Sequence, residues 1–220
     1  MNTLECIKTR RSIRKFTSEA VPQKDLEELI KIARWSPSYK NSQPWEAIIL
    51  SGDKKKGLSK MLVGLLNDGK ESAPDLAAPT SWPEAEGNRI KNLLARRKEL
   101  TGIDLGAPEM IFKAKKANFN FYFAPHVIYL FQDASLSEWS LFDIGLFAQS
   151  LMLAAHASGL ATVPQAFATD YAKEVKEFLG IPASKRLILG LSVGYPDVES
   201  PVNAYRTERS EIDEFCTYME

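Results

Sequence analysis

The residues best suited to chemistry in this chain lie near its N-terminus. Residues 9–16 carry three arginines, one lysine and two hydroxyl side chains. Such a cluster of positive charge repels itself unless an anion lies among the side chains or water surrounds them. Arginine forks match phosphate oxygens two at a time, and a serine adds one more donor. The segment therefore predicts a site for a phosphorylated cofactor, and the alternative is a solvated basic arm.

The overall composition requires any such anion site to be local. The 220 residues include 28 Lys and Arg and 28 Asp and Glu, so the formal net charge is zero. This balance argues against nucleic acid or an acidic membrane as a partner. Cys6 and Cys216 stand near opposite ends and form no disulfide framework, which favours a reducing, cytoplasmic location. The most apolar run, 141–163, contains Asp143 and His156, and we expect a buried helix of a soluble protein rather than a membrane span.

Several kinds of chemistry are disfavoured by what the sequence lacks. No glycine-rich phosphate loop of either common pattern is present. The two histidines, His126 and His156, lie in apolar segments, where a core or interface histidine is the simplest interpretation. A structural zinc site and a Ser-His-Asp triad are both improbable on this basis. Chemistry that side chains cannot perform remains, and this points to an organic cofactor.

The elements that must position these residues follow from hydrophobic periodicity. We expect a short opening helix around Leu4 and Ile7, and further helices at 23–35, 54–66, 89–100, 109–121, 138–158, 170–179 and 211–219. We expect strands at 45–50, 126–131, 161–167 and 186–195. The irregular stretch 67–88 is long for a compact domain, and Trp82 within it favours a functional loop. The pattern indicates one α+β domain with a mixed sheet of roughly four or five strands between helices.

Five sequence blocks, in this order, resemble the flavin-dependent nitroreductase family. They are RRSIRKF at 10–16, SPSYKNSQPW at 36–45, GLATVPQA at 159–166, GLSVGYPD at 190–197 and PVNAYRTER at 201–209. The resemblance implies a nitroreductase-like α+β fold, with a central mixed, mainly antiparallel sheet flanked by helices. It implies one domain over 1–220, an intertwined homodimer, and FMN at the subunit interface. The helical and loop insertion at about 67–120 resembles the longer, nitroaromatic-reducing branch and is expected to cover the active site.

The resemblance assigns the FMN phosphate to the two ends of the chain. Arg10 and Ser12 are expected to contact it, joined by Arg206 or Arg209 from the tail. A group with nearly two negative charges suits two or three arginine forks. Arg11 belongs to the same cofactor-binding segment, and we expect its side chain to face solvent or the partner subunit.

The flavin ring is assigned to three other segments. Arg14 is expected near N1 and O2, where reduced flavin is anionic and a cation favours hydride acceptance. The partner subunit is expected to supply Ser38, Tyr39 and Asn41 to the ring and ribityl chain. The strand end expected to cross the ring face near N5 consists of Pro164, Gln165 and Ala166. Asn118 is expected at the N3 and O2 edge, and Asn120 is the alternative.

The implied function is that of an FMN-dependent NAD(P)H nitroreductase. Hydride is expected to pass from NADH or NADPH through flavin N5 to a nitroaromatic or quinone-like acceptor, by a ping-pong mechanism. No side chain need act as acid or base, and no metal is expected. The alternatives are a related flavin enzyme of the dehalogenase or desaturase type, and a flavin-binding protein without turnover. Five aromatic residues could stack on the acceptor, although we expect at least half of them in the core: Trp82, Phe112, Phe119, Tyr122 and Phe123.

Overall fold

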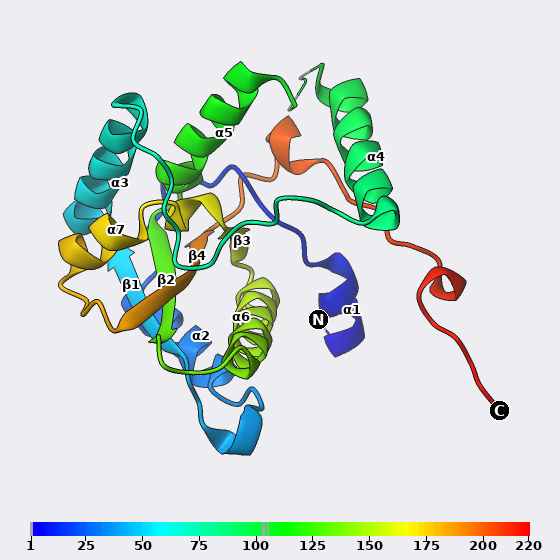
Figure 1. The fold of residues 1–220 in the computed structure, drawn as a ribbon, viewed down its shortest axis with the longest axis horizontal. Helices are drawn as coiled ribbons and strands as arrows, with labels where there is room; N and C mark the ends of the chain where they lie inside the picture. The colour runs from blue at the N-terminus through cyan, green and yellow to red at the C-terminus, as the bar shows by residue number, and fades with distance from the viewer. Residues whose placement is uncertain (1, 103, 105) are drawn as a thin grey trace.

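A four-stranded sheet organises the molecule, seen in the computed structural model, which describes residues 2–102, 104 and 106–220 (Figure 1). Its strands are β1 (Glu46–Ser51), β2 (His126–Asp133), β3 (Ala161–Gln165) and β4 (Lys185–Gly194), in the order β1-β2-β4-β3. Every pairing between these strands is antiparallel. A parallel pairing enters at the edge, where an isolated bridge joins Ser12 to Thr162. The mixed, mainly antiparallel character predicted from the sequence therefore depends on the N-terminal arm.

Strand β2 shows why helices cover both faces of the sheet. Val127, Tyr129 and Phe131 pack in one apolar cluster, whereas Ile128 and Leu130 pack in another. This alternation follows from the two-residue period of a strand. Because both sets of side chains are apolar, each face of the sheet needs a covering layer.

Helices α2 (Gln23–Ala33) and α6 (Trp139–Ala157) cover one face, and α3 (Gly52–Asn67) and α7 (Ala172–Leu179) cover the other (Figure 1). Within the described residues, α6 is the one helix with the length and apolar composition of a membrane span. Its buried residues pack in the same cluster as those of α2 and the sheet. These contacts make α6 a core helix of the domain.

Three further helices lie outside these layers. They are α1 (Thr3–Thr9), α4 (Glu84–Thr101) and α5 (Pro108–Phe119). Helices α4 and α5 stand together at one end of the molecule, and the C-terminal tail runs past α4 and away from the body (Figure 1). The loop that precedes β1 lies at the opposite end.

Four sequence-based boundaries are clearly wrong, each for a local reason. Helix α4 begins at Glu84 rather than at residue 89, directly after Pro83, so the irregular stretch predicted at 67–88 is shorter than expected. Helix α5 ends at Phe119 rather than at Phe121, because Phe121, Tyr122 and Phe123 have φ of 53°, 51° and 60°, which no right-handed helix accommodates. Strand β3 ends at Gln165, because a 3₁₀ turn follows it. The helix predicted at 211–219 is a single 3₁₀ turn, Ile212–Glu214.

Candidate functional site

The N-terminal arm is held along the outer edge of β3. Arg10 ends α1, and its backbone N–H donates to the carbonyl of Cys6. The chain then extends beside the strand, where the Ile13 N–H donates to the Thr162 carbonyl at 3.1 Å. The Ile13 side chain is buried, so the arm is fixed by packing as well as by hydrogen bonds. This arrangement presents the basic residues of the arm at the edge of the sheet.

A cavity of about 330 Å³ lies where the arm, α6 and the C-terminal tail meet. We call the part of the lining formed by the basic residues Arg10, Arg11, His156 and Arg206 the basic end of the site. Glu5 and Asp197 also line the cavity. Within the described part of the chain, Nη1 of Arg10 is buried and has no hydrogen-bond partner. A buried donor without an acceptor costs free energy, and an anion in the cavity would satisfy it.

The charges of the arginines in and near the basic end influence the pKa values of its residues. Burial lowers the pKa of Arg10, and the charge of Arg209 lowers it further. Burial and then Arg206 lower the pKa of Arg11. The pKa of His156 is lowered by burial, then by its arginine neighbours. Arginine stays protonated despite such shifts, so the basic end keeps its positive charge at neutral pH. A phosphate group in the cavity would relieve this repulsion.

Asn203 fixes the tail against the arm and so brings Arg206 to the cavity. Its side chain is 3% exposed and bonds three backbone groups. Oδ1 accepts from the Arg14 N–H at 2.8 Å, and Nδ2 donates to the carbonyls of Lys15 and Asp197 at 2.8 and 2.9 Å. Sequence reasoning gave Asn203 no role, although it lies within the block at 201–209.

The structure separates the two arginines between which the sequence left a choice. Arg206 lines the cavity beside Arg10. Arg209 lines a different groove of about 1060 Å³ between α4 and the tail, and its Nη1 donates to Thr207 Oγ1 at 2.6 Å. Arg209 therefore affects Arg10 only through its charge, which lowers the pKa of Arg10, whereas Arg206 lines the same cavity as Arg10. Arg11, which we expected to face solvent or a partner, also lines this cavity.

A second arginine accompanies Arg14 and was missed in the sequence. Arg97 of α4 lies with its guanidinium 5.9 Å from the centre of the Tyr205 ring. Burial lowers the pKa of Arg97, and the charge of Arg14 lowers it further. In the sequence Arg97 stands among other charged helical residues, a pattern typical of a solvated face. Only the folded chain shows that it accompanies Arg14.

At the other end of β3, hydrogen bonds within the chain define the wall of the site. Pro164 and Ala166 are exposed, whereas Gln165 is 1% exposed and points into the protein. Gln165 Nε2 donates to the Asn118 carbonyl at 2.9 Å, and the Ser192 hydroxyl donates to Gln165 Oε1. We call this region, centred on Asn118 and residues 164–170, the bracketed end. At this end the Gln165 side chain is held in the core, so this stretch offers a ligand its backbone and its exposed residues Pro164, Ala166 and Phe167.

The structure also distinguishes Asn118 from Asn120, the two candidates for the edge of the flavin ring. Asn118 is buried beside Gln165, and its Nδ2 donates to the Ala114 carbonyl at 2.8 Å and to Tyr122 Oη at 3.0 Å. Asn120 instead bonds Ser59 and the Lys116 carbonyl, at 3.1 and 2.9 Å. Asn120 thus faces α3, and Asn118 faces the end of β3.

The three residues expected from a partner subunit lie away from both ends. The Tyr39 N–H donates to the buried carboxylate of Asp143 at 3.1 Å, and the Tyr39 ring stacks on Trp139. Ser38 Oγ accepts from a backbone N–H of the same loop, and Asn41 is exposed with φ of 56°. One chain does not bring this loop to its own Arg10, so a contribution to a partner's site stays a prediction.

The aromatic residues of 67–120 and its exit are more exposed than expected. Phe119 is fully buried and Tyr122 is half-buried. Trp82, Phe112 and Phe123 are exposed by 54%, 42% and 69%. At most two of the five rings, Phe119 and Tyr122, therefore lie in the core, so the expectation of at least half is wrong. The other three rings are accessible to a ligand or partner.

The comparison with known protein families decides the classification. The model of the Nitroreductase family matches residues 7–195, which is most of the chain. The chain belongs to the nitroreductase family. The matched range contains the arm, the sheet and the turn after β3.

Individual nitroreductases resemble this chain over nearly its full length. A 4-nitrobenzoate reductase of Pseudomonas putida is 31% identical over 213 residues, covering 97% of this chain and 93% of the relative. Nitroreductase NfnB of Mycolicibacterium smegmatis is 31% identical over 215 residues, covering 94% and 88%. A crystal structure of FMN-dependent NfnB from Mycobacterium smegmatis in complex with NADPH matches with a TM-score of 0.92 at 29% identity, covering 99% of this chain and 97% of that one.

The two ends of this nitroreductase site are suited to bind and orient a ligand. The described residues contain no group of three or more His, Cys, Asp or Glu side chains that could hold a metal ion. The basic end offers cationic donors to an anion, and the bracketed end offers a fixed backbone edge and a buried amide. Such a pair of regions suits a phosphorylated organic cofactor whose own chemistry is reactive.

Proposed function

We propose that this chain is an FMN-dependent NAD(P)H oxidoreductase that reduces nitroaromatic or quinone-like acceptors. The observation that carries the proposal is the buried, unpartnered Nη1 of Arg10 beside a cavity shared with Arg11 and Arg206. Similarity to an FMN-dependent nitroreductase in complex with NADPH and to a 4-nitrobenzoate reductase supports it. FMN, when bound, supplies hydride transfer from NADH or NADPH to the acceptor in a ping-pong sequence.

The phosphate end of this proposal rests on charge. Arg10, Ser12 and Arg206 would hold the phosphate, since two guanidinium forks and a hydroxyl match its oxygens. Arg11 adds positive charge from the cavity wall. Arg209 strengthens the field from the neighbouring groove.

The ring end of the proposal rests on position. Arg14, whose charge also lowers the pKa of Arg97, would supply positive charge to the pyrimidine edge of the ring. Asn118 would face the same edge, and the exposed residues Pro164 and Ala166 would lie against the ring face. The accessible rings of the 67–120 segment and its exit would stack on a planar acceptor. No protein acid or base is required, since solvent can supply the proton.

The proposal includes one domain over 1–220, covered by the segment 67–120, in a homodimer. Large apolar side chains are exposed on α1 and at the start of α6, among them Leu4, Trp139 and Phe142. A partner over this surface would bury them and could bring Ser38, Tyr39 and Asn41 to the other subunit's site. We propose a cytoplasmic location, which suits the two free cysteines.

The dimer is tested by measuring mass in solution. Light scattering after gel filtration should give twice the mass of one chain for the unmodified protein. Phe142→Asp should shift the mass toward one chain and lower FMN affinity. A single-chain mass for the unmodified protein at micromolar concentration would exclude this part of the proposal.

The cofactor and the reaction are tested on purified protein. It should be yellow, and heating should release a flavin that carries phosphate. NADH or NADPH oxidation should accelerate when 4-nitrobenzoate is added. Turnover of halotyrosines without turnover of nitroaromatics would favour the dehalogenase alternative, and flavin binding without turnover would favour a carrier. A colourless protein that takes up no added FMN would refute the proposal.

A further inference from the structure

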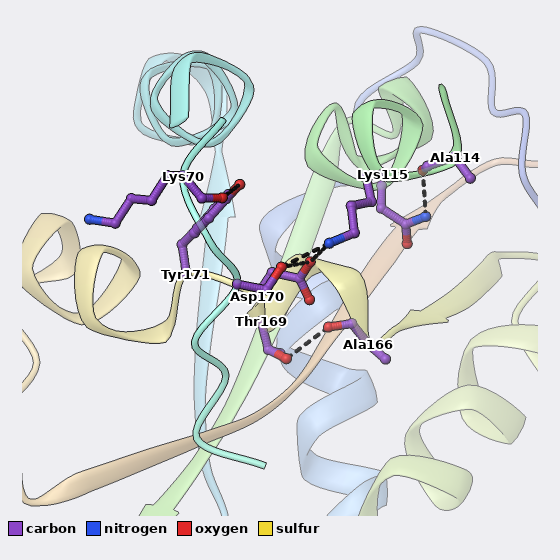
Figure 2. Close-up of polar contacts among 9 residues, drawn as sticks. Lys70, Ala114, Lys115, Ala166, Thr169, Asp170 and Tyr171 are labelled. Atoms are coloured by element: carbon purple, nitrogen blue, oxygen red, sulfur yellow. Dashed lines mark hydrogen bonds and ion pairs between the residues drawn. The ribbon is translucent and has the colours of Figure 1, made fainter. Parts of the chain in front are cut away.

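A compact polar cluster lies directly after β3, at the bracketed end (Figure 2). The Asp170 carboxylate pairs with Lys115 Nζ at 2.7 Å and accepts from Ser72 Oγ at 2.9 Å. Lys115 Nζ also lies 2.8 Å from Ser72 Oγ, so the three polar groups meet at one point. The side chains of Lys115 and Asp170 are only 23% and 10% exposed. An ion pair this buried is retained only where geometry and added hydrogen bonds offset its desolvation.

The cluster joins three segments that are distant in sequence. Ser72 follows α3, Lys115 lies on α5, and Asp170 ends the turn after β3. Backbone groups reinforce the junction, because the Ala73 N–H donates to the Asp170 carbonyl at 2.6 Å. Tyr171 Oη donates to the Lys70 carbonyl at 3.1 Å. Asp170 is therefore the point at which the beginning and the end of the 67–120 segment are both tied to the sheet.

The same turn fixes Ala166, the last residue of the stretch proposed to face the flavin. The Ala166 carbonyl accepts two hydrogen bonds from Thr169, from Oγ1 at 2.7 Å and from the backbone N–H at 2.9 Å (Figure 2). The Asp170 N–H donates to the Phe167 carbonyl at 3.0 Å. Residues 166–170 thus form one hydrogen-bonded turn, and displacement of Asp170 would carry Ala166 with it.

Helix α5 is tied to this stretch twice. Lys115 holds Asp170, and one turn further along the helix Asn118 accepts from Gln165 at 2.9 Å. Lys115 Nζ also lies 5.4 Å from the centre of the Phe167 ring. The two ties set the separation between Asn118 and Ala166, which the proposed function places at different atoms of the same flavin ring.

We propose that Lys115, Asp170 and Ser72 form a positioning clamp that fixes Ala166 relative to Asn118 and anchors the 67–120 segment over the ring. The role of the clamp toward flavin rests on the proposed function. The ordering of residues 166–170 by the clamp does not depend on that function, since it should occur with or without cofactor. None of the three residues need touch the ring, because they act through Ala166 and Asn118.

The chain offers a matched control at a similar depth. Lys176 pairs with Asp75 at 2.8 Å, with side chains 11% and 23% exposed. This pair also ties the 67–120 segment to the body, since Asp75 accepts from the Leu187 N–H at 2.7 Å. It involves neither α5 nor the turn at 166–170. A loss caused by general destabilisation should therefore appear in both pairs, and a loss of positioning only in the clamp.

The first experiment measures amide hydrogen exchange at 166–170 in the cofactor-free and FMN-loaded protein. Lys115→Met and Asp170→Asn should accelerate exchange there by about tenfold or more in both forms. Ser72→Ala, a milder change, should act in the same direction if a charge variant fails to fold. Lys176→Met should lower the melting temperature without changing exchange at 166–170. Unchanged exchange in Lys115→Met, or equal acceleration in Lys176→Met, would overturn the clamp.

The second experiment uses kcat/KM with NADPH and 4-nitrobenzoate, together with the visible spectrum of bound FMN. Each charge variant should lose about tenfold in kcat/KM, as expected for a displaced binding wall. The double variant should lose little more than either single variant, and Lys115→Arg should retain most activity. Losses that multiply, with an unchanged spectrum, would refute positioning through the pair. Failure to bind FMN would refute the proposed function, while exchange in the cofactor-free protein would still test the clamp.

Discussion

At the basic end, Arg10, Arg11 and Arg206 line one cavity, and a donor of Arg10 is buried without an acceptor. At the bracketed end, the Gln165 side chain is also buried, yet its amide is bonded to Asn118 and Ser192. In the proposed function, a ligand would complete the first region, whereas the second is complete within the chain. The difference teaches that one cofactor can be held by two strategies. Affinity should come mainly from the basic end, and alignment from the bracketed end.

The largest effect should follow from removing the unpartnered guanidinium. Arg10→Ala should weaken FMN binding by about 10- to 100-fold, because a charge-assisted hydrogen bond contributes roughly 1.5–3 kcal/mol. Fluorescence titration with FMN and with riboflavin measures the effect. Riboflavin lacks the phosphate, so its affinity should change little, and Lys8→Ala on the exposed side of α1 should change neither. An equal loss for both flavins would mean that the basic end is not the phosphate site.

A substitution at the bracketed end should lower FMN affinity less than Arg10→Ala does, and it should lower the stability of the protein more. Gln165→Leu leaves the buried Asn118 carbonyl without its Gln165 donor and leaves the Ser192 hydroxyl only the Phe121 carbonyl as acceptor, which should lower the free energy of unfolding by about 1–3 kcal/mol. Urea unfolding of the cofactor-free protein measures this change. FMN affinity should fall by less than it does in Arg10→Ala.

Gln132→Leu is the matched control for this prediction. Gln132 is fully buried in β2, and in the part of the chain that the structure describes its side-chain amide has no hydrogen-bond partner. Its replacement removes no such bond, so the stability should stay equal or rise. A loss in Gln132→Leu as large as that in Gln165→Leu would contradict the contribution assigned to the hydrogen bonds.

The smallest effect should be a pH dependence that belongs to the basic end. The pKa of His156 is lowered from its ordinary 6.5 by burial and by Arg10, Arg11 and Arg206. The unfolded chain therefore binds the proton more tightly, and the folded state loses stability as pH falls below about 6.5. His156→Asn should make the fall in melting temperature between about pH 7 and pH 5 shallower.

A residual fall should persist in that variant, since burial and Lys55 lower the pKa of His126 as well. His126 Nε2 accepts from the Val21 N–H at 3.0 Å, and protonation there removes the acceptor. Thermal scans of the cofactor-free protein at several pH values measure both contributions. If melting temperature depends on pH in the same way in His156→Asn and in the unmodified protein, protonation of His156 does not contribute to the pH dependence of stability.

Much of the fold could be predicted from the sequence because its signals are local. Apolar residues occupy consecutive positions in 126–131, and the long apolar segment ending before Gly159 marks α6. The basic end was also visible, since its arginines are concentrated at the two ends of the chain. Its histidine was not, because His156 stands in an apolar helix and looks like a core residue.

The bracketed end could not be predicted in the same way. Lys115 and Asp170 are 55 positions apart in the chain, and neither stands in a distinctive motif. Lys115 belongs to a run of lysines that suggests a solvated helix, and Asp170 looks like a helix cap. The left-handed backbone at 121–123 was hidden too, since aromatic residues rarely adopt it without tertiary contacts. Such features depend on which segments meet, and the chain order alone does not show this.

The parallel bridge between Ser12 and Thr162 has a consequence for solubility. β3 is an edge strand, and exposed edges pair readily with strands of other molecules. The N-terminal arm occupies that edge, and Pro164 removes one donor from it. Shortened chains that begin beyond Phe16 would therefore lose the proposed cofactor contacts and uncover an aggregation-prone edge at the same time. Variants truncated or fused at this terminus should therefore keep the arm, because it covers the exposed edge of β3.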